Sequence, residues 1–286
     1  MIHSNWDASI RKVPLSDNNG TKSCAWAVQR EDYIETSQVN ENDETITAQG
    51  PLWKEVGVVS NNYLLIPNKQ VVELANDIAD SSGLQWTEDK RFWNGRQFMY
   101  SLVAKNHIEE VSIGDDVALG MMFWNSYDGS TSLQFRLYLQ RLVCLNGMVS
   151  NDVFKAHRFK HSNASEGYED EIIEASKIIT TSEDRIRYFI NALRYLSENE
   201  MDMENLALLR EKYFPRIPTS LFGNIMDKLL NYRPNGKPTT YDFLNSATNL
   251  LWHKKKQTKS DYDHNAYLVD GLIRYANREA KPIEYN

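Results

Sequence analysis

The sequence predicts an α+β fold, with an antiparallel β-sheet and a β-hairpin/helix core in the N-terminal half and a mostly helical C-terminal half. Two patterns support this prediction: apolar residues alternate with a period of two in segments before residue 150, and they recur near a period of 3.6 after Glu169. Three regions are expected: a polar N-terminal arm over residues 1–50, an antiparallel α+β core over 51–165, and a helical region packed on the core over 166–286.

Polar residues dominate the first fifty positions. Runs such as Ser16–Gly20 and Val39–Glu44 favour loops, and one short strand, Ala25–Val28, is expected between them. Because this segment offers few apolar side chains to bury, we expect the arm to be partly extended and weakly packed, or docked on a neighbouring subunit.

A β-hairpin followed by a helix is predicted at the start of the core. Val56–Val59 and Tyr63–Ile66 are rich in strand-forming residues, and Ser60–Asn62 between them favours a turn. Asn68 is a suitable N-cap for the following helix. Gly83 is expected to end that helix, since glycine readily adopts the left-handed conformation found at helix C-termini.

Two further hairpin turns are predicted from dipeptides that tolerate positive φ angles. Asn94-Gly95 is expected to join two strands, the second of them over Arg96–Val103. Asp128-Gly129 is expected to join the apolar run Val117–Trp124 to a strand that begins near Leu133. The predicted sheet therefore grows by antiparallel neighbours.

The strand that begins at Leu133 has a strict two-residue alternation. Successive side chains of a strand point to opposite faces, so one face is apolar and the other polar and basic. We therefore expect a half-buried strand. The apolar face comprises Leu133, Phe135, Leu137 and Leu139, and these alternate with Gln134, Arg136, Tyr138 and Gln140.

Helical periodicity dominates the rest of the chain. Apolar residues recur at spacings of three and four, and several segments begin with residues that cap helices. Prolines and an Asn-Gly turn separate some of these segments. The expected helices cover residues 172–179, 183–196, 204–213, 221–230, 240–252 and 267–273.

Composition limits the classes of protein that fit this sequence. Hydrophobic residues make up 41% and charged residues 25%, which is ordinary for a folded protein. No apolar run approaches the roughly 20 residues of a membrane-spanning helix, and the first residues lack the pattern of a signal peptide. The two cysteines lie far apart in the sequence, which fits a reducing compartment. We expect a cytoplasmic protein.

Positive charge is concentrated in one segment of an acidic chain. Residues 134–161 carry five Lys or Arg against one Asp, a formal charge of +4, whereas the remainder carries −11. Clustered cations neutralise phosphates, and aromatic rings among them can stack on bases. A surface strand with ordinary solvated charges fits the charge pattern equally well. The predicted nucleic-acid-binding residues are Arg136, Tyr138, Arg141, Lys155, His157, Arg158, Phe159, Lys160 and His161.

The same stretch offers a weaker metal hypothesis. His157 and His161 have the spacing that places two side chains on one helical face, but Arg158 and Lys160 between them would repel a cation. Three aspartates, Asp115, Asp116 and Asp128, could supply carboxylate ligands or an acid/base pair, yet Asp beside Gly is also typical of turns, which we favour. Cys144 lies in an apolar run and is interpreted as a small buried hydrophobe. No glycine-rich phosphate loop is present, and we expect neither a bound metal nor a cofactor.

Several motifs, among them Gly57–Ser60, Asn125–Ser130 and Arg141–Met148, together resemble a domain-of-unknown-function family of phage/plasmid-like proteins, over roughly residues 50–275. The family commonly has a threonine after its cysteine–asparagine element, where this chain has Leu145–Met148. The motifs that carry the resemblance are Gly57–Ser60, Tyr63, Asn125–Ser130, Arg141–Met148, His157, His161, and Thr240, Asn245 and Thr248 before Trp252.

This resemblance implies a protein of mobile genetic elements, and it brings no assigned activity. Phages and plasmids commonly encode single-strand annealing proteins, which are built on a β-β-β-α core and assemble into rings or filaments. By this analogy we expect a non-enzymatic protein that binds and anneals single-stranded DNA as an oligomer. Two alternatives stay open: a metal-dependent enzyme acting on nucleic acid or nucleotides, and an interaction protein whose acidic surface docks on a host factor.

Overall fold

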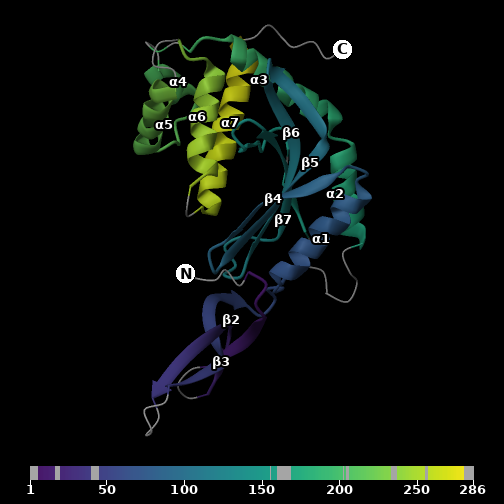
Figure 1. Ribbon diagram of the computed structural model, residues 1–286, viewed down its shortest axis with the longest axis vertical. Helices are drawn as coiled ribbons and strands as arrows, with labels where there is room; N and C mark the ends of the chain where they lie inside the picture. Colours follow the sequence, from purple (N-terminus) through teal and green to yellow (C-terminus); the bar gives the residue numbers. More distant parts are fainter. Residues whose placement is uncertain are drawn as a thin grey trace.

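The chain has a mixed α+β architecture, which confirms the predicted fold class. Antiparallel sheets occupy the N-terminal half, and the helices lie mostly in the C-terminal half (Figure 1). The computed structural model describes residues 6–16, 20–39, 45–154, 156–159, 169–201, 203, 206–232, 237–254 and 257–279.

A three-stranded antiparallel sheet forms an N-terminal ribbon that projects from the body of the molecule (Figure 1). Its strands are β1 (Ile10–Ser16), β2 (Lys22–Val39) and β3 (Thr45–Ser60), in the order β1-β2-β3. The predicted strand Ala25–Val28 lies within β2, but β2 is much longer than expected and two further strands flank it where no strand was predicted. The predicted boundary between residues 50 and 51 falls inside β3, and the one between 165 and 166 lies outside the described residues.

The predicted hairpin over residues 56–66 is also wrong. Val56–Val59 is a strand, but it pairs with β2 of the ribbon, with Val59 opposite Trp26. Tyr63–Ile66 forms no strand and leads directly into the first helix. Its Tyr63 hydroxyl instead donates a hydrogen bond of 2.6 Å to the Ser126 carbonyl, which fastens the ribbon to the body.

A larger antiparallel sheet forms the body. Its strand order is β4-β5-β6-β7-β8, with β9 paired to β7 beside β8. Gly95 and Gly129, at φ angles of 93° and 73°, lie in the two turns predicted from their dipeptides. The strands are β4 (Trp86–Trp93), β5 (Gln97–Ser112), β6 (Asp115–Ser126), β7 (Gln134–Arg141), β8 (Asn146–Val149) and β9 (His157–Arg158).

Helices cover both faces of this sheet. The first three lie along one face, and α6 and α7 pack against β8 and the opposite face (Figure 1). Described helices are α1 (Asn68–Ser81), α2 (Glu169–Thr180), α3 (Glu183–Glu198), α4 (Leu206–Tyr213), α5 (Thr219–Tyr232), α6 (Thr240–Trp252) and α7 (Lys259–Glu279).

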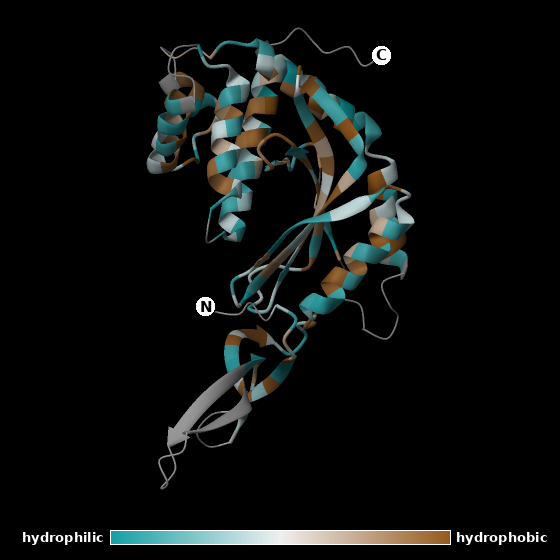
Figure 2. Cartoon of the chain, in the orientation of Figure 1, coloured by the Kyte–Doolittle hydropathy of each residue, from teal (hydrophilic) through white to brown (hydrophobic). Residues whose placement is uncertain are grey.

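The two faces of the sheet have separate cores. We call the face covered by α1, α2 and α3 the first face and the one covered by α6 and α7 the second face. On the first face, Phe135, Leu137 and Leu139 of β7 join the main core, as the alternation predicted. On the second face, Tyr138 packs with Trp252 of α6 in a smaller core. Apolar residues on the inner sides of the strands and helices are visible in Figure 2. The second face of β7 is therefore more buried than we expected, because α6 and α7 cover it.

The start of α1 differs from the prediction. Pro67, not Asn68, is the N-cap. The buried Asn68 side chain donates instead to the Trp6 carbonyl at 2.8 Å and accepts from the Asn125 side chain at 3.2 Å. Asn68 thus ties three chain segments together, and Gly83, at a φ of 73°, follows the helix as expected.

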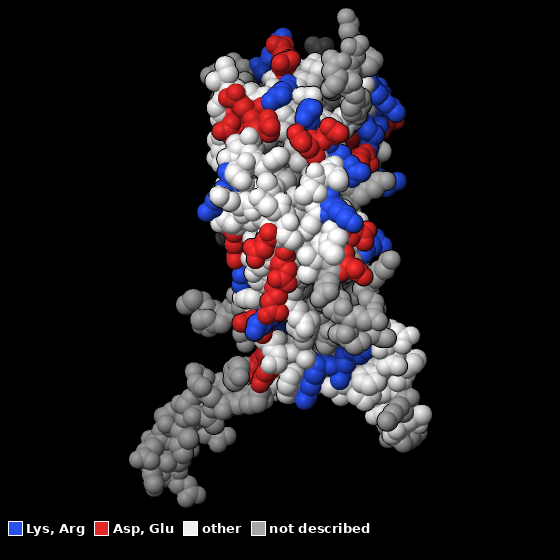
Figure 3. Space-filling view, turned by 90° about the vertical axis from the view of Figure 1, so that its right-hand side faces the viewer, with Lys and Arg blue, Asp and Glu red and all other residues white. Residues whose placement is uncertain are grey.

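The outer surface of the helical face is mixed in charge. Figure 3 views this side and shows acidic side chains gathered on its middle, with basic ones more scattered. Exposed Glu73, Asp77 and Asp80 lie along one side of α1. Within the described part of the chain, none of the helices has the length and apolar character needed to span a membrane.

Candidate nucleic-acid interface

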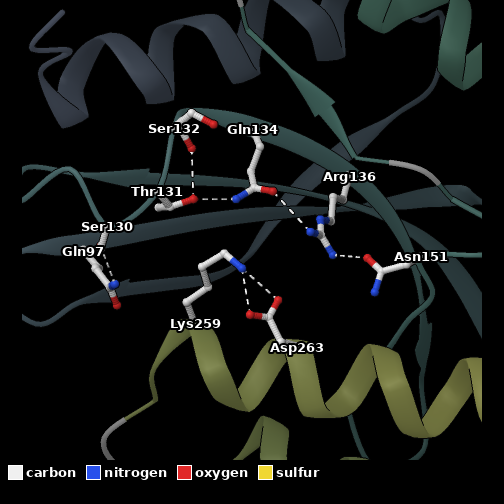
Figure 4. A network of polar contacts seen from close by, with 9 residues as sticks. All are labelled: Gln97, Ser130, Thr131, Ser132, Gln134, Arg136, Asn151, Lys259 and Asp263. Carbon is white, nitrogen blue, oxygen red and sulfur yellow. Dashed lines mark hydrogen bonds and ion pairs between the residues drawn. The ribbon is translucent and has the colours of Figure 1, made fainter. Parts of the chain in front are cut away.

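A narrow cleft lies between the second face of the sheet and the start of α7. Its volume is about 20 Å³, enough for an atom group the size of a water molecule or a phosphate oxygen. Figure 4 shows its polar side chains, with Lys259 and Asp263 on α7 and Gln134 and Arg136 on the facing strand. The lining residues are Met122, Trp124, Gln134, Arg136, Val149, Lys259, Tyr262 and Asp263.

Arg136 is a half-buried cation of this cleft. Its guanidinium donates to the Asn151 side-chain oxygen at 2.6 Å and to the Gln134 side-chain oxygen at 3.2 Å (Figure 4). Both acceptors are neutral amides, and no ion pair to Arg136 occurs within the described parts of the chain. Because guanidinium groups bind carboxylates and phosphates most strongly, this arrangement leaves Arg136 ready for an external anion.

Two carboxylates that act electrostatically on Arg136 have their hydrogen bonds with other groups. Asp263 accepts two hydrogen bonds from Lys259, at 2.8 and 2.7 Å. Asp270 accepts from the Ser150 hydroxyl at 2.6 Å and from the Asn151 backbone N–H at 3.1 Å. Burial lowers the pKa of Arg136, the two aspartates raise it, and Arg158 lowers it.

Asp270 also holds the loop that positions Arg136. Besides Ser150 and Asn151, its carboxylate accepts from the Asp152 backbone N–H at 3.3 Å. Burial raises the pKa of Asp270, and the hydrogen bonds from this loop oppose that effect. A buried carboxylate bound by several backbone donors fixes the loop, and the loop in turn presents the Asn151 oxygen to Arg136.

Gln134 is held in place from the turn before β7. Its side-chain nitrogen donates to the Thr131 hydroxyl at 2.7 Å, which directs its oxygen toward Arg136 (Figure 4). The Thr131 backbone N–H in turn donates to the Ser126 hydroxyl at 3.1 Å. Of the two amide partners of Arg136, Gln134 is thus held through its side chain and Asn151 through its backbone.

Trp124 contributes a free hydrogen-bond donor to the cleft wall. The residue is 4% exposed, and its indole Nε1 is buried without a hydrogen-bond partner among the described residues. Its ring packs against Tyr262 at a centroid distance of 4.8 Å and against Phe92 at 6.2 Å. A buried indole N–H usually has an acceptor, so an anion or carbonyl oxygen in the cleft would satisfy it.

Arg158 places a second cation on the same side of the sheet. It pairs with Gln134 across β9 and β7, and paired residues of neighbouring strands point to the same face. Its side chain is exposed and makes no ion pair with any described residue. Arg136 and Arg158 are therefore the two predicted cations that the structure places on the cleft side of the sheet.

Two predicted aromatic residues are buried. Tyr138 is 0% exposed and donates its hydroxyl to the Asp89 carboxylate at 3.0 Å. Phe159 is 2% exposed and packs on Phe123 with centroids 6.3 Å apart. Neither ring offers a free face, so the expectation that they stack on bases does not fit this structure. The alternation of β7 could not show that α6 would cover its second face.

Other predicted residues lie away from the cleft. Arg141, near the opposite end of β7, donates to the Asp115 carboxylate at 2.6 Å. His157 pairs with Phe135, so it points to the first face of the sheet, where Glu174 lies 3.8 Å away. The remaining three lie outside the described residues: Lys155, Lys160 and His161.

The structure separates the residues of the metal hypothesis. Asp115 begins β6 and Asp128 follows its end, and at about 3.3 Å per residue the two are on the order of 40 Å apart. In the described parts of the chain, no group of three or more His, Cys, Asp or Glu side chains is placed to hold a metal ion. Cys144 lies in the turn after β7, half-exposed, with an Arg141 nitrogen 3.4 Å from its sulfur.

Sequence reasoning missed the residues that complete the cleft. Asn151, Lys259, Asp263 and Asp270 come from a loop and from α7, more than 100 positions apart in the sequence. Lys259 and Asp263 have the i, i+4 spacing of an ordinary surface pair, so nothing local marked them. Only the packing of α7 on the sheet brings them opposite Arg136.

One comparison places the chain in a family. A model of a domain of unknown function, DUF932, matches residues 55–273. The chain belongs to the DUF932 family. The DUF932 match begins within β3 and ends within α7, so it includes the whole cleft. It confirms the resemblance to a domain of unknown function, close to the expected 50–275. No curated protein and no solved structure matches the chain.

Proposed function

We propose that this DUF932 protein is a phage- or plasmid-type protein that binds single-stranded DNA and anneals it as an oligomer. The observation that carries the proposal is Arg136: a half-buried guanidinium held by two neutral amides, without a carboxylate partner among the described residues. A backbone phosphate would give the guanidinium a direct ionic partner, in addition to the electrostatic effect of Asp263 and Asp270.

The surroundings of Arg136 favour this ligand. Arg158 adds a second positive charge on the same side, and the Trp124 indole N–H offers a donor to a phosphate oxygen. Phe92, half-exposed beside Trp124, provides a ring on which a base can stack. Cations combined with aromatic platforms are the usual means of holding a single strand without sequence preference.

The size of the cleft favours a single strand over a duplex. At about 20 Å³ it can admit phosphate oxygens but no base, so the strand would lie along its mouth. The rigid spacing of phosphates in a duplex would restrict the approach of a backbone to Arg136 between α7 and the sheet. A flexible single strand can present one phosphate to the guanidinium while its bases remain outside.

A salt titration with matched variants tests the proposal. Binding of a labelled oligonucleotide is measured by fluorescence anisotropy at several salt concentrations, for the unmodified protein, Arg136→Gln and Arg187→Gln. Loss of one phosphate contact is expected to weaken binding about tenfold or more and to flatten the log–log salt slope by about 0.7. Arg187, an exposed arginine of α3 paired with Glu183, is the control and should change neither quantity.

Strand preference and annealing need separate measurements. The unmodified protein should bind a single strand more tightly than the same sequence as a duplex, and it should accelerate pairing of complementary strands carrying a fluorophore and a quencher. Absence of oligonucleotide binding at low salt, or equal binding by the unmodified protein and Arg136→Gln, would overturn the proposal.

A further inference from the structure

A second cavity lies at the edge strand β4, on the first face of the sheet, whereas the Arg136 cleft lies on the second face. Its volume is about 350 Å³, far larger than that of the Arg136 cleft. Among the described residues, Trp6, Glu88, Arg91 and Trp93 line it. Two indoles, a guanidinium and a carboxylate are the groups that recognise a planar ring carrying both hydrogen-bond donors and acceptors.

A β-bulge brings these side chains together. Between Glu88 and Lys90 the register of β4 against β5 shifts by one residue. In a regular strand, Glu88 and Arg91 would point to opposite faces. The bulge places Glu88 on the same face as Arg91 and Trp93, which are opposite Tyr100 and Phe98 of the first-face core. Re-aiming one side chain in this way is a common use of bulges in edge strands.

The polar groups of the cavity are fixed in position. The Arg91 guanidinium lies over the Trp6 ring at 4.0 Å and over the Tyr100 ring at 5.2 Å. It donates from Nη2 to one oxygen of Glu88 at 2.7 Å. The Arg91 Nε is buried without a hydrogen-bond partner among the described residues, whereas the Tyr100 hydroxyl interacts with the side chains of both Arg91 and Glu88. The Glu88 side chain is 44% exposed, so its carboxylate keeps lone pairs for a ligand, and Arg91 keeps further N–H donors.

The two indoles form a corner rather than a parallel sandwich. Trp6 is almost parallel to Phe98, at 13°, whereas Trp93 is inclined to Phe98 by 68°. Trp6 and Trp93 thus meet at a steep angle. Both rings are partly exposed, so a flat ligand can contact the face of one and the edge of the other.

We propose that this cavity binds a nucleobase, with guanine preferred. Guanine offers adjacent N–H donors to the Glu88 carboxylate and two acceptors, O6 and N7, to the Arg91 guanidinium. Adenine and cytosine lack the ring N–H beside an amino group, and thymine lacks the amino group. This inference rests on the proposed binding of single strands and adds a base-specific subsite to it.

The cavity and the Arg136 cleft are placed so that one DNA strand can reach both. Cross-strand pairing aligns Phe92, Met99, Trp124, Gln134 and Arg158 in one row across the second face. Phe92 ends this row at the sheet edge, three strands or about 14 Å from β7. Its neighbours Arg91 and Trp93 point to the cavity. A strand bound at Arg136 therefore reaches the cavity by passing around the β4 edge.

The test compares oligo-thymidine strands that carry one central guanine, adenine or cytosine. At fixed salt, the unmodified protein should bind the guanine strand about tenfold more tightly than the other two, a discrimination typical of one good bidentate contact. Glu88→Gln should abolish the preference and leave the salt slope unchanged. Glu73→Gln is the control, since this exposed glutamate of α1 also pairs with a basic residue, Lys69.

Different results would overturn the guanine subsite and the proposed binding of single-stranded DNA. Equal affinity for the three strands, with binding still dependent on Arg136, would overturn the guanine subsite and leave the proposed function standing. Arg136→Gln should show the converse, a flatter salt slope with the guanine preference retained. If no oligonucleotide binds, calorimetric titration with deoxyguanosine monophosphate decides the subsite: Glu88-dependent binding supports it, and absence of binding overturns it.

Discussion

Gly147 shows how tightly single residues are fitted at the junction between the sheet and α6. A Cβ atom added at this position would collide with the six-membered ring of Trp252. Gly147 lies in β8, and its carbonyl accepts a hydrogen bond of 2.9 Å from the Asn265 side chain of α7. The backbone of β8 therefore cannot retreat from Trp252 without losing its contact with the other helix.

Substituting Gly147 by alanine is expected to destabilise the fold. Overpacking of this kind costs about 1–3 kcal/mol in the free energy of unfolding, measurable by urea denaturation. Gly223→Ala is the matched control, because no atom lies within 4 Å of its added Cβ and its helix position should gain up to about 1 kcal/mol. Equal stability of the two variants would contradict the packing described for β8.

Among the elements, β4 connects both faces of the sheet. On the second face, Asp89 accepts hydrogen bonds from Tyr138 at 3.0 Å and Gln140 at 2.7 Å. Its neighbour Lys90 donates to the Trp252 carbonyl and lies over the Trp252 ring. Burial lowers the pKa of Lys90 to about 8, although Asp89 opposes this effect. The strand thus holds α6 through a lysine that is costly to keep charged.

Lys90 is expected to give the fold a specific pH dependence. The pKa of an unfolded lysine is about 10.4, so between pH 8 and that value the unfolded chain binds more protons than the folded one. Stability from this group therefore rises with pH across that window. Urea denaturation at pH 7.5 and 9.5 should show a gain in the unmodified protein that is reduced in Lys90→Met.

Lys69→Met provides the comparison for Lys90. The Lys69 side chain is 73% exposed on α1, so its removal should leave the pH response of the unmodified protein unchanged. If the unmodified protein and Lys90→Met respond equally to pH, then Lys90 is not held in the desolvated position seen between β4 and α6.

Elements that depend on residues close together in the sequence could be predicted from it, whereas those that depend on residues far apart in the sequence could not. The alternation of β7, the turns at Gly95 and Gly129 and the helix after Pro67 follow from local periodicity and glycine chemistry. The ribbon was missed because a sheet with solvated faces needs no apolar alternation. The cleft was found only in part, since Arg136 belongs to a local pattern and Asp263 comes to it through tertiary packing.

At the scale of the whole molecule, the N-terminal ribbon stands apart from the body (Figure 1). A small core of Val28, Val56, Val59 and Tyr127 fixes its base. Val58 and Leu52 of β3 are 56% and 46% exposed. A projecting sheet with exposed apolar residues fits the oligomer of the proposed function, in which the ribbon would lie on a second copy of the chain.

If the ribbon forms the oligomer interface, size-exclusion chromatography should detect the assembly. The unmodified protein should elute as a species larger than its 33.2 kDa chain and should grow further with a long oligonucleotide. Val58→Lys should reduce assembly, because a charge in a buried interface is costly. Leu230→Lys, at a 53% exposed position of α5, is the control. A 33 kDa particle under all conditions would contradict assembly.

The helical cover of the second face has a consequence for synthesis of the chain. Met99, Met122, Trp124 and Tyr138 are buried there by residues of α6 and α7. These helices follow the end of β7 by about 100 residues, which takes roughly 5–20 seconds at ribosomal rates of about 5–20 residues per second. During that interval the finished strands lack the helices that bury their apolar side chains, so we expect the nascent chain to be prone to aggregation until its last helices emerge.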